Sequence, residues 1–415
     1  MALSAGLRAL GQRDYRVYFI GTLVGQTGIW MQTVTQAWLV LQLTNSPFLL
    51  GLTSTLQFGP ILLFSLFTGV LADRVTRRTL LFITQSVQCA LALTLGLLAW
   101  SGQARYWHVL VVAVMWGIMS AIDQPARLSL VMELAGRANV ASAVGLNSAA
   151  FNGARIIGPS IAGILIARVG LSLGFFLNAI AFVFAIAMLA LIPGRRPVPR
   201  DAGRTFGGDI LEGLRYSLQT PAVRLIMGLQ IILSFCVFNF SVYVPLLARD
   251  RLGMGAEGFG LLMACLGVGA LTAGLSLGAL SVSALRPGTI AIALAVALGG
   301  LVGLAFTRWF GLAAGLLAVT GFAGTLVMAG CNTSLQLSAP DALRGRVMSL
   351  YTLLSGGVFP IGAFWVGFVA EHGGVQRAFF VNGAVGIVAL AALLSWWRAR
   401  GRRVADTQET LAHDP

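Results

Sequence analysis

Charged residues are scarce in this sequence, and that scarcity excludes the ordinary soluble proteins. Only 10% of the 415 residues are charged, whereas 57% are hydrophobic, and a typical soluble domain carries about 25% charged residues. Histidine is rarer still, with 3 copies in the whole chain. A transition-metal site built on imidazole is therefore not expected, and no metal or other cofactor is predicted.

The few cysteines do not suggest a disulfide framework. Cys89, Cys236, Cys265 and Cys331 all fall within long apolar runs, where cysteine serves as a small packing residue. The sequence also has no nucleophile–base pair, no metal cluster and no phosphate-binding loop, so it does not predict an enzyme. No small-residue cleavage site follows a short apolar stretch near residue 1, so we expect no removed signal peptide.

Long apolar runs dominate the chain instead. Runs of about 20 residues recur, and each is long enough to cross ~30 Å of hydrocarbon as a helix. The 51 glycines suit helices that pack closely in a membrane. The sequence therefore predicts an all-α membrane protein with twelve transmembrane helices, at roughly 17–42, 48–71, 79–101, 107–126, 139–167, 172–192, 222–247, 257–280, 287–306, 310–334, 346–370 and 376–397.

The arginines set the predicted orientation. Every basic residue is an arginine, and the net charge is +14. On this span map Arg155 lies within a span, the large majority lie on the side of the N-terminus, and those on the opposite side are Arg105, Arg168, Arg249, Arg251, Arg308 and Arg377. This asymmetry places both termini in the cytoplasm, since basic residues are retained there. The positive charge thus reflects topology, and no nucleic-acid partner is predicted.

One polar stretch, 193–221, divides the chain into two six-helix halves at 1–192 and 222–397. Its Pro, Gly and Arg content predicts a cytoplasmic linker, followed by a short interfacial helix around 209–218. The polar residues 398–415 are predicted to form a disordered cytoplasmic tail.

The two halves are related by an internal repeat. A shift of 204 residues superposes several pairs in order, namely Gly158 on Gly362, Gly163 on Gly367, Phe175-Phe176 on Phe379-Phe380, and Asn178 on Asn382. We therefore expect two pseudo-symmetric halves that share one fold.

A short basic turn with one acid separates the second and third spans. It resembles the G-x-x-x-D-R-x-x-R-R loop of the major facilitator superfamily, matched here by Gly69, Asp73, Arg74, Arg77 and Arg78, with Thr76 in place of a usual glycine. The resemblance implies a cytoplasmic latch, in which Asp73 contacts the start of span 11 and Arg127 of span 4. A topology anchor is the alternative, although an anchor needs the arginines and not the acid.

Span 4 carries Trp116, Asp123 and Arg127 on one helix face, with Pro125 between the last two. Asp123 is the only acid that we place within a span, so it is the candidate for a proton carrier. The alternative is a structural pair of Asp123 with Arg127.

Span 5 carries a run of small residues with one proline. Its G-P-x-x-x-G pattern resembles the antiporter motif of the drug-exporting branches, matched by Gly153, Gly158, Pro159 and Gly163. A closely packed, bendable helix of this kind is a candidate hinge for alternating access. Close packing alone is the alternative.

Arg155 lies near the centre of span 5, where an arginine must face protein or water. Ser148, Asn152 and Arg155 form a polar stripe along the helix. Arg155 is a candidate to bind an anionic or polar substrate, or to act on an acid in proton coupling. A hydrogen-bonding brace between helices is the alternative.

Span 1 has a polar face that suits a cavity for an amphiphilic organic solute. We expect the cavity to be lined by Gln26, Trp30, Thr33, Gln36, Asn152, Arg155, Asn239, Asn332 and Tyr351. For each residue taken singly, hydrogen bonding between helices is the alternative.

These motifs together resemble the drug and siderophore exporter branch, which includes macrolide-efflux and enterobactin-exporter-like proton antiporters. The resemblance implies a monomer in the bacterial inner membrane that exports a drug-like compound or siderophore by rocker-switch alternating access, in exchange for protons. A lipid or lysophospholipid flippase on the same fold is one alternative. A non-transporting sensor or scaffold is another, although 193–221 and 398–415 are short for a signalling domain.

Overall fold

The computed structural model describes residues 7–193, 214–279 and 286–413, apart from the side chains of 62, 65–74, 137, 141, 278–279, 341–342 and 400–413. The described residues form helices joined by short turns, with no β-strand among them. The predicted all-α class is confirmed.

The N-terminal half contains six long helices, preceded by a short 3-10 turn at Arg8–Gly11. The six are α2 (Arg13–Thr44), α3 (Pro47–Arg74), α4 (Arg77–Trp100), α5 (Tyr106–Ala135), α6 (Val140–Arg168) and α7 (Leu171–Ala190). Left-handed backbone conformations end several of them, as at Asn45, whose φ of 53° stops α2. Thr76 caps α4, because its Oγ1 accepts a hydrogen bond of 3.2 Å from the Thr79 amide.

The C-terminal half also provides six membrane-length segments, although two need comment. The first is interrupted, with α9 (Pro221–Ile232), a π-helical stretch at Leu233–Val237, α10 (Phe240–Leu246) and a second π-helical stretch at Leu247–Arg251. Next come α11 (Ala256–Ala279), α12 (Pro287–Phe306), α13 (Phe310–Ser338) and α14 (Asp341–His413). Gly374, with φ 78° and ψ 163°, breaks α14 into two helices. The described residues thus form twelve helical segments of membrane length, which is the number that the sequence predicts.

The helices have the length and composition of membrane spans. Nine of the described helices are long and apolar enough to cross a bilayer, with the two parts of α14 counted there as one. Large apolar side chains such as Leu97, Val183, Ile292 and Val388 are exposed on the outside of the bundle. Exposed apolar surface of this kind is stable against lipid, so the chain is a multi-pass membrane protein.

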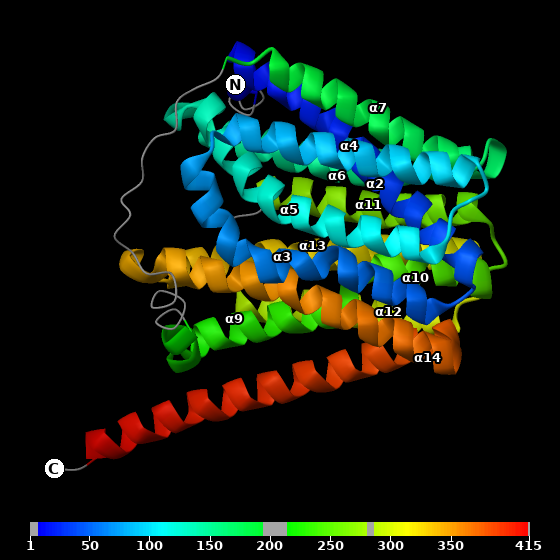
Figure 1. The fold of residues 1–415 in the computed structure, drawn as a ribbon. Coiled ribbons are helices and arrows are strands. Elements are labelled where there is room, and N and C mark those ends of the chain that lie inside the picture. The colour runs from blue at the N-terminus through cyan, green and yellow to red at the C-terminus, as the bar shows by residue number, and fades with distance from the viewer. Residues whose placement is uncertain (1–6, 194–213, 280–285, 414–415) are drawn as a thin grey trace.

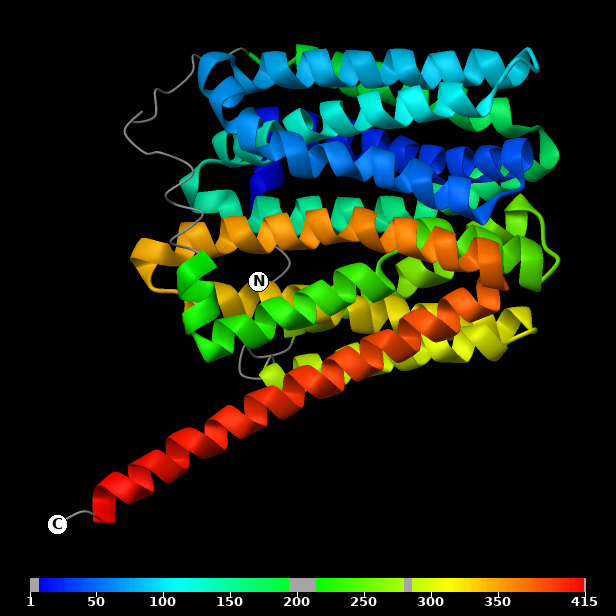
Figure 2. The ribbon, with the colours of Figure 1, turned by 60° about the horizontal axis from the view of Figure 1, so that its bottom comes forward.

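The helices pack as two bundles that lie side by side (Figures 1 and 2). Across the boundary, α6 packs on α11 and α3 packs on α14. The first residues of α2 and the last residues of α14 lie at the same end of the molecule, which we name the terminal side (Figure 1). The opposite end is named the far side.

The predicted repeat is visible in equivalent glycine contacts. Gly158 of α6 packs against the backbone of α2, and its counterpart Gly362 of α14 packs against the segment that follows α9. Farther along the same helices, Gly163 contacts α11 and its counterpart Gly367 contacts α3. The same pair of positions therefore makes one contact within each half and one contact between the halves.

Two buried hydrogen bonds repeat in the same way. Asn178 of α7 donates to Gln32 Oε1 of α2 at 2.5 Å. Its counterpart Asn382, in the last helix, donates to the hydroxyl of Tyr243 in α10. All four side chains are buried, so each half fastens its first helix to its last by an asparagine.

The linker and the tail are only partly described. Residues 194–213 lie outside the described residues, and 214–219, at the end of the predicted interfacial helix, are helical. The last helix is drawn as far as His413, and the disorder of 398–415 stays a prediction.

Candidate functional site

Asp123 and Arg127 form a buried ion pair within the N-terminal half. The guanidinium donates from Nε at 2.9 Å and from Nη2 at 2.8 Å, both to Asp123 Oδ2. The other carboxylate oxygen accepts from the Thr84 hydroxyl at 3.0 Å. A bidentate pair closed by a third partner satisfies both charges, as a low-dielectric environment requires.

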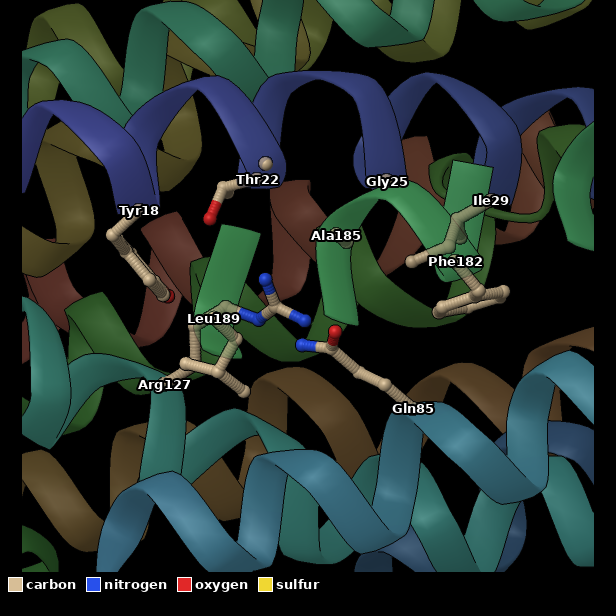
Figure 3. A pocket seen from close by; sticks show the side chains of 10 residues that line it. Tyr18, Thr22, Gly25, Ile29, Gln85, Arg127, Phe182, Ala185 and Leu189 are labelled. Carbon is tan, nitrogen blue, oxygen red and sulfur yellow. The ribbon is translucent and has the colours of Figure 1, made fainter. Parts of the chain in front are cut away.

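The ion pair borders a narrow pocket between α2, α4, α5 and α7 (Figure 3). Tyr18, Thr22, Gln85 and Arg127 point into the pocket from three of these helices. It has room for about one water molecule. Arg127 therefore faces a small chamber inside its own half, whereas the predicted latch assigns it to a contact with Asp73, whose side chain lies outside the described residues.

Two of the predicted latch arginines also bind within the N-terminal half. Arg77 pairs with Glu133 of α5 at 3.1 Å. Arg78 donates to the carbonyl oxygens of Leu189 at 3.1 Å and Ala190 at 2.9 Å, at the end of α7. These contacts fasten the start of α4 to its neighbours. The side chains of 65–74, and with them the predicted roles of Gly69, Asp73 and Arg74, lie outside the described residues.

The glycines of α6 have different surroundings. A Cβ on Gly158 would lie 2.7 Å from the Thr27 carbonyl oxygen, and one on Gly163 would lie 2.9 Å from the Ala256 carbonyl oxygen. A Cβ on Gly153 would meet nothing within 4 Å. Pro159 lies inside the continuous helix. Gly158 and Gly163 thus permit close helix contact, and only Gly163 reaches the other half.

Several of the predicted cavity residues make hydrogen bonds within their own helix. Thr33 and Asn152 donate to carbonyl oxygens four residues earlier, and Asn332 accepts from Gln336 at 2.6 Å. Tyr351 of α14 donates to the Met328 carbonyl oxygen of α13 at 3.0 Å, a bond between helices of the kind that the structural alternative describes. Gln26 is half-buried.

Gln36 and Asn239 each leave one polar atom without a partner. Gln36 donates to Gln57 Oε1 at 3.0 Å, and Asn239 donates to the Phe235 carbonyl oxygen at 2.6 Å. The Oδ1 of Asn239 and the Oε1 of Gln36 are buried with no partner among the described residues. Asn239 follows the break in the first span of the C-terminal half, where irregular backbone and functional sites often coincide.

Arg155 lies at the boundary between the halves. Its guanidinium carbon is 5.5 Å from the centre of the Trp30 ring in α2 and 6.0 Å from that of Phe240 in α10. Phe151 meets the Trp30 ring edge-on at 5.6 Å. We name Trp30, Phe151, Arg155 and Phe240 the Arg155 cluster. It draws one aromatic ring from the C-terminal half and its other members from the N-terminal half.

The far side is closed by contacts between the halves. Aromatic rings meet across the boundary in three pairs, Trp38–Phe259, Phe48–Phe364 and Phe58–Phe359. Thr55 of α3 donates to the Pro360 carbonyl oxygen of α14 at 2.9 Å. The largest hydrophobic core runs through both halves in this region. The terminal ends of α2, α4 and α5 share a separate core within one half.

Glu371 completes this far-side closure, and sequence reasoning missed it. Its Oε2 accepts from the Ser46 hydroxyl at 2.7 Å and from the Phe48 amide at 3.0 Å, at the start of α3. An acid at the end of an apolar run, opposite a Ser-Pro helix start, was the signal available in the sequence. The carboxylate thus joins the end of the first part of α14 to the amino terminus of α3 in the other half.

On the terminal side, equivalent helix surfaces are uncovered. Val144, near the start of α6, is 51% exposed. A Cβ on Gly145 of α6 or on Gly345 of α14 would meet nothing within 4 Å. No group of three His, Cys, Asp or Glu side chains suited to a metal occurs among the residues that the structure describes.

Known proteins are similar to this chain in sequence and in fold. Residues 4–413 match the family described as transmembrane secretion effector. The staphyloferrin A transporter of Staphylococcus aureus is 25% identical over 88% of this chain and 90% of its own length. The multidrug efflux pump Tap of Mycobacterium tuberculosis is 28% identical over 86% and 87%, and the enterobactin exporter EntS of Shigella boydii is 26% identical over 81% and 80%.

Solved transporters have the same architecture at low identity. The nucleoside transporter NupG superposes with a TM-score of 0.74 at 11% identity, covering 92% of this chain and 98% of its own. A bacterial homologue of the lysosomal transporter Spinster, inward-facing and occupied, superposes with a TM-score of 0.71 at 13% identity, covering 94% and 96%. By fold and by sequence, the chain belongs to the transmembrane secretion effector family, in the drug and siderophore exporter branch of the major facilitator superfamily.

Proposed function

We propose that this chain is a secondary active exporter, which moves an amphiphilic organic solute such as a drug-like compound or a siderophore out of the cytoplasm. The observation that carries the proposal is the asymmetric boundary between the halves. They meet closely on the far side, around Phe48, Phe364 and Glu371, while near the terminal side a Cβ on Gly145 of α6 would meet nothing within 4 Å. Such a boundary suits a site that opens to one side at a time.

The terminal side is the cytoplasmic side in this proposal, because it holds most of the arginines. The protein would then lie in the bacterial inner membrane with both termini inside, in its inward-facing state. One chain is the functional unit, since the proposed site lies between its own two halves.

Proton exchange would proceed through Asp123. It is the one buried acid among the described residues, and its charge is held by Arg127 and Thr84. Protonation of the carboxylate would break the pair and free Arg127, which already points into the pocket beside Tyr18, to change the packing of α5 against α2. A proton that falls through ~100 mV supplies ~2.3 kcal/mol, enough for a useful gradient of solute.

The latch and the hinge belong to the same proposal. Asp73 would close the cytoplasmic side against span 11 when the far side opens. Gly158, Pro159 and Gly163 would allow α6 to shift against α2 and α11 as the halves rock. The amides and aromatic residues near the boundary would contact the solute.

Accumulation of a panel of amphiphilic dyes and drugs tests the proposal. The host would be bacterial cells without their own efflux pumps, with and without an uncoupler. The variants are wild type, Asp123→Asn, and Asp250→Asn as a matched control. Asp250 also pairs with an arginine, Arg249, but outside the pocket. All three proteins are compared at equal amounts in the membrane.

We expect wild type and Asp250→Asn to lower the accumulation of at least one compound several-fold. The uncoupler and Asp123→Asn should each abolish the effect. Export that ignores the uncoupler would contradict proton exchange. Equal accumulation in all cells, together with movement of a labelled lysophospholipid, would favour the flippase. No movement of any compound or lipid would favour a sensor.

A further inference from the structure

Among the described residues, Arg155 is a cation without a counter-ion. It lies near the middle of α6, where an unpaired arginine is costly in a membrane. Within the described part of the chain, no carboxylate forms an ion pair with it, and the buried acid Asp123 is occupied by Arg127. The alternative that Arg155 acts on a neighbouring acid therefore finds no such acid among the described residues. Arg155 thus places an unpaired positive charge at the boundary between the halves.

Two hydrogen-bond donors at this charge lack a partner in the part of the chain that the structure describes. The Nε of Arg155 and the indole Nε1 of Trp30 are buried, and neither has a partner among the described residues. Buried donors are normally satisfied, so an unoccupied pair marks a place for an acceptor. A carboxylate is the acceptor that a guanidinium matches best, because it can receive two parallel hydrogen bonds.

The aromatic rings supply the apolar part of the site. Trp30 and Phe240 flank the guanidinium from opposite halves, and Phe151 packs edge-on against Trp30. Flat rings of this kind stack on an aromatic ligand or cover an apolar one. The backbone also departs from regular helix at Phe238–Asn239, directly before Phe240, as is common where spans line a binding site.

The geometry points to an organic anion as the exported solute, with an acidic group on Arg155 and an aromatic or apolar body between Trp30 and Phe240. This inference rests on the proposed export function and names its substrate class. A cationic solute would meet the positive charge of Arg155 and, among the described residues, no free buried acid. Because the cluster draws on both halves, an anion bound there would bridge them.

Binding of three matched probes to the purified full-length protein in lipid nanodiscs tests this assignment. Naphthylacetate, naphthylethanol and naphthylethylamine share one ring system and differ in charge. Equilibrium dialysis would measure the dissociation constant of each. The variants are Arg155→Gln, Arg155→Lys, and Arg224→Gln as control. Arg224 also lies over an aromatic ring, that of Trp396 at 3.7 Å, but away from the cluster.

We expect wild type to bind naphthylacetate at least about tenfold more tightly than the alcohol or the amine, a difference of ~1.4 kcal/mol. Arg155→Gln should remove this preference and leave binding of the alcohol unchanged. Arg155→Lys should keep part of it, and Arg224→Gln should keep all of it.

Three results would overturn the assignment: a preference for the amine, equal or absent binding of all three probes, or an Arg155→Gln variant that loses the alcohol as much as the anion. The last result would make Arg155 a structural brace. Uncoupler-sensitive export of the amine, with no binding of the acetate, would leave the export function standing and reject only the anion.

Discussion

Several charged residues of the N-terminal half bind partners close by. Asp123 and Arg127, the candidates for a proton carrier and a latch, form the structural pair that the sequence offered as the alternative. Arg77 and Arg78 bind within their own half. A coupling role for any of these four residues must act through the breaking of such contacts.

The pair of Asp123 with Arg127 predicts non-additive effects of mutation. Asp123→Asn leaves the arginine buried without its anion and should lower stability by about 3–5 kcal/mol. The double variant Asp123→Asn/Arg127→Gln removes both charges and should recover most of that loss, while transport stays abolished. Thermal unfolding midpoints of the purified variants, measured beside transport, check this. Additive losses would show that the two charges do not interact.

Glu371 predicts a change in the far-side closure. Glu371→Gln keeps the shape but removes the charge that holds Ser46 and the Phe48 amide. The far side should open more often, because charge-assisted hydrogen bonds are about twice as strong as neutral ones. A cysteine placed at Ala370, which is buried beside Glu371 in this state, should then react several-fold faster with a membrane-impermeant maleimide. Glu257→Gln, on α11, is a suitable control, and equal rates in both variants would exclude a role for Glu371.

At the scale of elements, α6 carries both an open face and a closed one. Two of its glycines differ in their surroundings. A Cβ on Gly153 would meet no neighbouring atom within 4 Å, whereas Gly163 touches the backbone of α11. The sequence could place these residues on one helix from the apolar run and the glycine spacing. It could not assign their neighbours, since Gly163 and its contact Ala256 belong to different halves and lie far apart in the chain.

The two glycines provide a matched pair for experiment. Gly163→Ala would place a methyl group 2.9 Å from the Ala256 carbonyl oxygen and 3.0 Å from Gly260 Cα. The helices must separate to admit it, so transport should fall at least tenfold. Gly153→Ala meets nothing within 4 Å and should transport normally, with stability unchanged or up to about 1 kcal/mol higher. Equal activity of the two variants would contradict the contact of α6 with α11.

Other elements show why sequence reasoning stops where it does. The span from Pro221 to Arg251 is a nearly uniform apolar run, so it was predicted as one helix. The first π-helical stretch and the break at Phe238–Asn239 contain no glycine or proline that would signal them, whereas Pro245 lies two residues before the second π-helical stretch. Gly374 does carry a signal, and the predicted spans separate there.

The whole molecule is a duplicated bundle whose halves meet at one end. The duplication could be predicted, because glycine and asparagine positions recur at one spacing, and these positions make equivalent contacts. The side on which the boundary is closed could not be predicted, because the same sequence must form both the state with a closed far side and the state with a closed terminal side. The proposed export function requires the protein to alternate between these two states.

Interspin distances test that claim most directly. In a background with the four cysteines replaced by alanine, one label pair at Ser101 and Arg308 spans the far side. A second pair at Ala138 and Ser338 spans the terminal side. Both are measured in nanodiscs at alkaline and acid pH, and with Asp123→Asn.

We expect two populations of interspin distances. One has a short far-side and a long terminal-side distance, as in this structure, and the other reverses both. Acid pH or Asp123→Asn should shift the balance between them. A single set of distances in every condition would contradict alternating access.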